Sequence, residues 1–124
     1  MTLQFYKCKH CGQIVAKVEA TDADIICCGS PMEAMEANTV DASQEKHVPV
    51  ADCKDGELRI HVGAEDHPMT REHHIKWVYA ETASGGYFKC FRPEDKPHAC
   101  FTLGKKEKPV KIYSLCNLHG LWLA

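Results

Sequence analysis

Cysteine and histidine residues near the carboxyl end of the sequence carry its strongest chemical signal. Cys116 and His119 stand three apart in a segment that ends in glycine, so one turn can direct both side chains to one ion. His47, His67 and His73 precede them in loop-like stretches. One thiolate and four imidazoles leave one position open on a six-coordinate metal, and this donor set suits a redox iron better than zinc, which favours a closed tetrahedron. We therefore predict an iron centre at which a small oxidant can bind.

Each of these histidines has an ordinary explanation when it is taken alone, because a single histidine in a loop is usually a surface or hydrogen-bonded residue. We assign His10, His61 and His98 to that ordinary group. His74 competes with His73 for the role of ligand. As the first residue of a strand it would project away from its neighbour, so His73 is the predicted ligand.

A second set of thiols lies near the start of the chain. Cys8 and Cys11 form a Cys-x-x-Cys pair, and after fifteen further residues come the adjacent Cys27 and Cys28. Four thiolates from two clusters predict a closed tetrathiolate metal site. The ligand type alone leaves zinc and a one-electron iron centre both open, and the adjacent second pair departs from a zinc ribbon.

Composition and charge limit the classes of function. A formal net charge of −2 disfavours a broad nucleic-acid footprint, and no apolar run is long enough to span a bilayer. We expect no signal peptide and a cytoplasmic location. Eight cysteines in metal-binding spacings fit a reducing compartment, with Cys53, Cys90 and Cys100 left as free thiols.

The elements that must position these side chains are mainly β-strands. Residues 1–36 are too few to bury a core without a metal, residues 37–44 are small and polar and form a predicted linker, and residues 45–124 alternate like strands. In the segment 57–62, Leu58, Ile60 and Val62 point one way, and Ile75, Trp77 and Tyr79 are expected to share a face of the next strand. The strands predicted in this part are 47–51, 57–63, 74–80, 86–91, 98–103, 109–115 and 121–124. Such a series predicts an immunoglobulin-like antiparallel β-sandwich.

These motifs resemble those of a known family. The segments Glu45–Val50, His67–Met69, Glu72–His73 and Cys116–Gly120 are similar to the signature segments of superoxide reductases. The four-cysteine unit resembles the desulforedoxin-type domain that precedes them in the two-iron class, the desulfoferrodoxins. The resemblance covers nearly the whole chain, in order. His74 is the one departure near the site, since relatives carry an aromatic residue there.

The resemblance implies a function and a role for each site residue. It implies two mononuclear irons per chain, one held by the four cysteines and one held by four histidines and a cysteine. In the second site His47, His67, His73 and His119 would be equatorial and Cys116 axial. Glu45 would close the sixth position in the oxidised state, and Lys46 would lie near the open face. The implied reaction is reduction of superoxide to hydrogen peroxide with electrons from a small donor such as rubredoxin, by a homodimer.

Three other functions remain to be distinguished. The chain could be an iron electron-transfer protein without substrate turnover, or a zinc-stapled binding module without catalysis. It could also be a dismutase, although Glu45 closing the ferric site would hinder the second half of that reaction. The colour of the protein and the oxygen evolved per superoxide consumed separate these cases.

Overall fold

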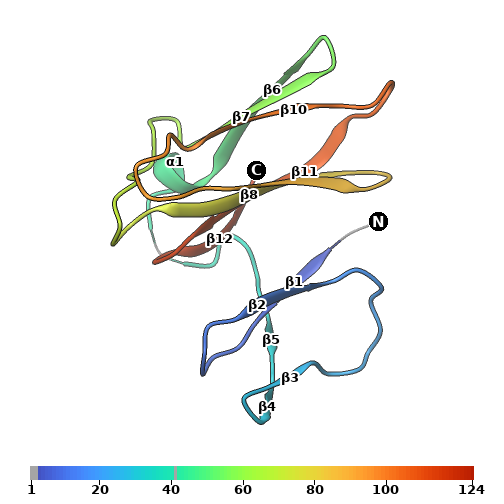
Figure 1. The fold of residues 1–124 in the computed structure, drawn as a ribbon, viewed down its shortest axis with the longest axis vertical. Helices are drawn as coiled ribbons and strands as arrows, with labels where there is room; N and C mark the ends of the chain where they lie inside the picture. The colour runs from blue at the N-terminus through green and yellow to red at the C-terminus, as the bar shows by residue number, and fades with distance from the viewer. Residues whose placement is uncertain (1–2, 41) are drawn as a thin grey trace. The chain divides into compact units, whose positions relative to one another are not determined.

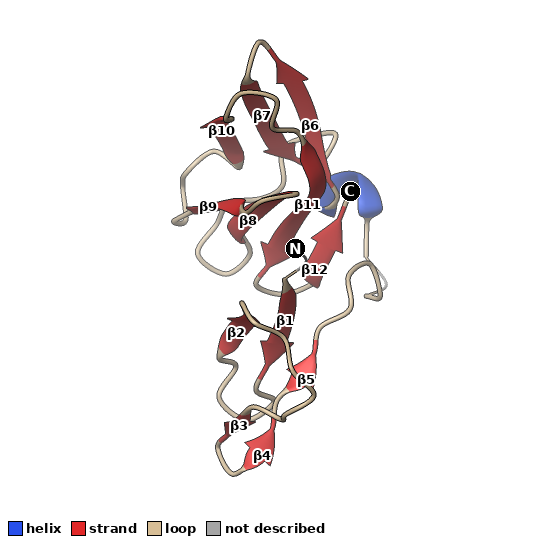
Figure 2. Cartoon of the chain, turned by 90° about the vertical axis from the view of Figure 1, so that its right-hand side faces the viewer, coloured by secondary structure: helices blue, strands red, loops and turns tan. Residues whose placement is uncertain are grey.

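The computed structural model describes residues 3–40 and 42–124, and these form two compact units, one within residues 3–36 and one within residues 37–124. Met1 and Thr2, which belong to the predicted first domain, and Asp41, in the predicted linker, lie outside the described residues. Almost all regular structure is strand (Figure 2). In the described part of the chain the one helix has four residues, so no helix there is long enough to cross a bilayer.

The first unit is a small set of short strands around the four cysteines. Strand β1 (Gln4–Lys7) pairs on one side with β2 (Ile14–Lys17) and on the other with β5 (Glu33–Ala34), both antiparallel. Strands β3 (Ile26–Cys27) and β4 (Ser30–Pro31) form a separate hairpin. The buried apolar side chains described in the first unit are few, namely Leu3, Phe5, Cys8 and Met32. A core this small needs a metal to hold it.

The second unit is an antiparallel sandwich of two sheets (Figure 1). Strands β6 (Pro49–Lys54), β7 (Glu57–Val62) and β10 (His98–Thr102) form one sheet in the order β10-β7-β6. Strands β8 (Ile75–Thr82), β9 (Gly86–Cys90), β11 (Pro109–Cys116) and β12 (Gly120–Leu123) form the other in the order β12-β11-β8-β9. The predicted mainly β fold is confirmed. The short helix α1 (Gln44–His47) lies at one end of the sandwich.

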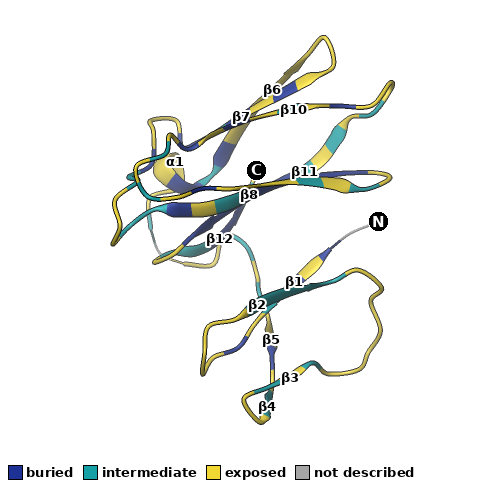
Figure 3. Cartoon of the chain, in the orientation of Figure 1, coloured by how far each residue is buried: buried dark blue, intermediate teal, exposed yellow. Residues whose placement is uncertain are grey.

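The core between the sheets follows the alternation of the strands. Leu58, Ile60 and Val62 of β7 are buried as predicted, and they pack in one cluster with residues of β8 and β11 (Figure 3). Burying such side chains stabilises a fold by about 1.5–3 kcal/mol each. This core provides the rigid frame from which the loops at the sandwich end project.

Two local predictions are wrong. We predicted that Ile75, Trp77 and Tyr79 share a face, but the core contains Ile75 together with Val78 and Ala80. The pairing of β8 with β11 shifts register between Leu115 and Cys116, and such a bulge moves the following side chains to the opposite face. We also predicted a strand from residue 47, whereas residues 44–47 are helical and β6 begins at Pro49.

Candidate metal centres

The four cysteines of the first unit converge on one point. The sulfur atoms of Cys8, Cys11, Cys27 and Cys28 all lie within 4.8 Å of one another. Turns bring them there: Gly12 donates its amide to the Cys8 carbonyl (2.9 Å) with a φ of +80°, and Cys28 itself has a φ of +52°. Both conformations are left-handed, which glycine tolerates and other residues adopt only when held by their surroundings.

The pKa values of the thiols in this cluster are shifted in different directions. The Cys11 amide donates to the Cys8 sulfur (3.5 Å) and is the main cause that lowers the pKa of Cys8 to about 6. Side-chain hydrogen bonds with Cys8 and Cys11 raise the pKa of Cys27 to about 12. Side-chain hydrogen bonds with Cys11 and Cys8 also raise the pKa of Cys28. A bound metal ion would favour the thiolate at all four positions, so the donor set fits a tetrathiolate metal site.

Four imidazoles of the second unit form a closed ring at the end of the sandwich that carries α1. The ring centroids of successive neighbours are 4.6 Å apart for His47–His67 and for His67–His73, 5.0 Å for His73–His119 and 4.8 Å for His119–His47. The diagonal from His47 to His73 is 6.1 Å. Each neighbouring pair meets edge to face, at 73–86°. Four side chains arranged in this way could ligate one ion.

The thiol of Cys116 joins this ring. The ligand atoms of His47, His67, His73 and Cys116 lie within 4.8 Å of one another. His119 Nδ1 lies 3.0 Å from His47 Nε2 and 3.9 Å from Cys116 Sγ. Two nitrogens bound at right angles to one ion, each about 2.1 Å from it, are about 3.0 Å apart. All five predicted donors are thus brought together.

The hydrogen bonds of the imidazoles leave the Nε2 atoms of two of them without a partner in the described structure. His47 Nδ1 lies 2.6 Å from the Ser43 carbonyl and His67 Nδ1 lies 2.7 Å from the Pro68 carbonyl, so each donates a proton outward. Among the described residues, His67 Nε2 and His73 Nε2 are buried without a hydrogen-bond partner. A buried polar atom without a partner is costly, and a metal ion is a partner that these two nitrogens fit.

The environment also favours the protonation states that bind metal. Burial lowers the pKa of His67 to about 4, and burial is the main cause that lowers the pKa of His47 and His73 as well. These imidazoles are therefore neutral at pH 7, which is the form that ligates metals. Burial raises the pKa of the Cys116 thiol, while the amides of His119 and Leu118 lower it. A bound metal ion would supply a nearby positive charge that stabilises the Cys116 thiolate.

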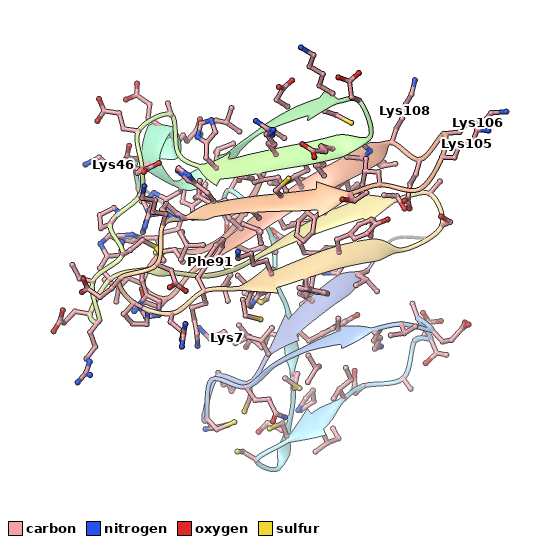
Figure 4. All side chains as sticks on the ribbon, turned by 45° about the horizontal axis from the view of Figure 1, so that its top comes forward. Lys7, Lys46, Phe91, Lys105, Lys106 and Lys108 are labelled. Atoms are coloured by element: carbon pink, nitrogen blue, oxygen red, sulfur yellow. The ribbon has the colours of Figure 1, made fainter. Side chains whose placement is uncertain are left out.

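Glu45 and Lys46 lie on α1 beside this ring. Both are exposed, and Lys46 points into solvent at the α1 end, opposite the tip that carries Lys105, Lys106 and Lys108 (Figure 4). After burial and the neighbouring histidines, the Lys46 charge is a further cause that lowers the pKa of His47 and His73. The Ala64 amide donates to the Glu45 carbonyl and the Gly63 amide to the Val48 carbonyl. A Cβ at Gly63 would lie 2.7 Å from the Lys46 carbonyl oxygen, so only glycine permits this approach.

Two residues that the sequence did not predict support His47 from β11 and β12. Ser114 Oγ donates to the His47 carbonyl oxygen at 2.7 Å, and Ser114 is fully buried. Its cross-strand partner Trp122 stacks on the His47 ring at 4.9 Å and donates Nε1–H to the His119 carbonyl at 3.1 Å. A serine and a tryptophan inside strands carry no signal that separates this role from ordinary core packing.

The remaining histidines lie outside the ring. His98 Nε2 pairs with Asp66 Oδ1 at 2.8 Å, and His61 Nδ1 bonds to the Gly63 carbonyl at 2.8 Å. His10 Nε2 lies 3.5 Å from Ser30 Oγ in the first unit. His74 follows His73, but its ring is not among the four that form the closed arrangement, and its Nδ1 is buried without a partner in the described structure.

An antiparallel β-sandwich with a histidine-cysteine centre at one end, preceded by a four-cysteine unit, defines a class of mononuclear non-haem metalloproteins. Comparisons with known proteins identify the family. Residues 39–124 match the desulfoferrodoxin family model, and residues 1–35 match the model of the desulfoferrodoxin N-terminal domain. The chain belongs to the desulfoferrodoxin family, and its two donor sets fit the two iron centres of that family.

Individual relatives agree with this assignment. A desulfoferrodoxin of Syntrophotalea carbinolica is 42% identical over 97% of this chain and 94% of its own length. A superoxide reductase of Pyrococcus abyssi is 38% identical over 63% of this chain and 83% of its own. The crystal structure of the superoxide reductase from Treponema pallidum superposes with a TM-score of 0.86 at 32% identity, covering 100% of this chain and 99% of that one.

Proposed function

We propose that this protein reduces superoxide to hydrogen peroxide. The observation that carries the proposal is the ring of four imidazoles with one buried thiol beside it, in a chain whose relatives include superoxide reductases. The reaction consumes one superoxide, one electron and two protons and forms one hydrogen peroxide. These five donors would hold a ferrous ion, which would supply the electron when bound.

The donors have distinct tasks in this proposal. His47, His67, His73 and His119 would hold the ion through their ring nitrogens. Cys116 would hold the same ion through its thiolate, which would donate electron density to the metal. One thiolate and a divalent ion leave the centre with a charge of about +1, which favours an anionic substrate.

Two charged residues of α1 act at the open side. Lys46 provides a mobile positive charge that attracts superoxide and orders water, from which the two protons come. Glu45 would supply a carboxylate to the ion after reduction, which would favour release of the peroxide. Its exposed position on a helix of one turn leaves its side chain free to move.

The first unit supports the second in a different way. We propose that Cys8, Cys11, Cys27 and Cys28 hold a second mononuclear iron in a domain of residues 1–36, followed by a linker of residues 37–44 and the catalytic domain of residues 45–124. A tetrathiolate centre has no position for a substrate. It can therefore only pass electrons or stabilise the fold of its domain.

Partners and compartment belong to the same proposal. The electrons come from a small redox protein such as rubredoxin, the chain forms a homodimer, and it works in the cytoplasm. All eight cysteines are free thiols, as in a reducing compartment.

The oxygen balance tests the proposed reaction. Protein loaded with iron and kept reduced by a donor is mixed with superoxide, and oxygen and hydrogen peroxide are measured. Reduction yields about one peroxide per superoxide and almost no oxygen, whereas a dismutase releases about one oxygen for every two superoxides. Protein loaded with zinc is the control, since zinc has no redox chemistry. An iron-loaded protein that changes oxidation state but does not consume superoxide would be an electron carrier only.

A further inference from the structure

Asn117, the residue directly after Cys116, bonds to both sides of the peptide segment that carries His73. Its side-chain Oδ1 accepts the His74 amide at 2.9 Å, and its Nδ2 donates to the Glu72 carbonyl at 2.9 Å. Its main-chain amide donates to the His74 carbonyl at 3.1 Å. One carboxamide thus brackets His73, and it belongs to the same turn as the axial sulfur.

These bonds act where the regular strand pairing stops. The register of β11 and β8 shifts between Leu115 and Cys116, and Cys116 pairs with Ile75 as the final pair of the ladder. Beyond it, the main chain of His73 is held on its other side by Thr70, whose amide donates to the His73 carbonyl at 3.0 Å and whose Oγ1 accepts the His73 amide at 3.1 Å. The orientation of the His73 ring depends on these backbone hydrogen bonds, because its Nε2 has no hydrogen-bond partner in the described structure.

We infer that Asn117 is a positioning residue, which holds the imidazole of His73 in a fixed place relative to the sulfur of Cys116 before metal binds. Ligands held in place in advance need less ordering when the ion arrives, so affinity for the metal rises. The inference rests on the proposed function only for the identity of the metal. Because Asn117 is exposed, its substitution leaves the core between the sheets intact.

Asn117→Ala tests the inference, with Asn38→Ala as the matched control. Asn38 is also exposed and also uses its carboxamide twice, since Oδ1 accepts the Leu123 amide at 2.9 Å and Nδ2 donates to the Leu123 carbonyl at 3.1 Å. It contacts none of the five donors through these bonds. Both variants and the parent protein are loaded with Fe²⁺ without oxygen, and transfer of iron to a chelator is followed for each centre.

In Asn117→Ala the dissociation constant of the histidine-cysteine centre should rise on the order of tenfold, the equivalent of about one net hydrogen bond. The tetrathiolate centre in the same molecule should keep its iron unchanged, and Asn38→Ala should behave as the parent. The visible charge-transfer band of the oxidised histidine-cysteine centre should shift in Asn117→Ala alone. In the metal-free parent the His74 amide should exchange with deuterium slowly, and in metal-free Asn117→Ala quickly.

Equal chelator kinetics and an unchanged band in Asn117→Ala would overturn the inference, as would rapid exchange of the His74 amide in the parent. An equal loss of iron in Asn38→Ala would reduce the role of Asn117 to general stability. These outcomes are independent of turnover. Failure of the proposed function would appear instead as a parent protein that binds iron tightly and consumes no superoxide.

Discussion

The bond from Ser114 to His47 gives a sharp test of how the sandwich supports its metal ligands. Ser114→Ala removes a buried hydroxyl that donates to the His47 carbonyl oxygen at 2.7 Å, while alanine keeps the strand and the packing around Cβ. Removing one partner of a buried hydrogen bond costs about 1–3 kcal/mol. Ser43→Ala is the matched control, because Ser43 also contacts His47 but does so through its main-chain carbonyl and makes no side-chain cap.

The assay is urea unfolding of the metal-free protein followed by tryptophan fluorescence. The chain has two tryptophans, Trp77 and Trp122, and both lie in the unit of residues 37–124, so the signal reports that unit alone. Ser114→Ala should lower the urea concentration at the midpoint of unfolding, with an unchanged m-value. In a thermal melt, it should lower the melting temperature by about 4–8 °C for each kcal/mol lost in a domain of this size. Ser43→Ala should match the parent. A parent-like Ser114→Ala, or a Ser43→Ala that is equally destabilised, would refute the reasoning.

Three further predictions concern the reaction, the spectrum and the pH dependence. Lys46→Ala should slow superoxide capture at low salt on the order of 2- to 10-fold and flatten its salt dependence without loss of iron; Lys108→Ala, at the opposite end of the sandwich, should do neither, and unchanged capture in Lys46→Ala rules out steering. Cys116→Ser should abolish the visible charge-transfer band of the histidine-cysteine iron and leave the tetrathiolate bands; survival of the band excludes Cys116 as axial ligand. In the metal-free protein, burial lowers the pKa of His67 from 6.5 to about 4. This residue's contribution to stability is therefore complete above pH 6.5, and up to roughly 3 kcal/mol of it is lost as the pH falls toward 4. Urea midpoints measured between pH 7 and pH 4 check this, and a flat profile would contradict it.

Local spacing in the sequence was enough to predict the four cysteines of the first unit and one pair of donors in the second. In the first unit the Cys8–Cys11 pair and the adjacent Cys27 and Cys28 need only two tight turns to converge. The pair Cys116 and His119 likewise comes from one turn after a strand. Alternation also predicted the buried face of β7, because a strand repeats every two residues and no other part of the chain alters that repeat.

The tertiary structure alone decided the order of the imidazoles and the way they are held. Which histidine neighbours which depends on how loops far apart in sequence meet at one end of the sandwich. The register shift between the pairs Leu115–Trp77 and Cys116–Ile75 placed Ile75 and Trp77 on different faces, contrary to our prediction, since register is set by long-range pairing and not by the strand's own pattern. Ser114, Trp122 and Asn117 hold ligands through bonds to main-chain groups of distant residues, and a main-chain group has no sequence identity from which such a bond could be predicted.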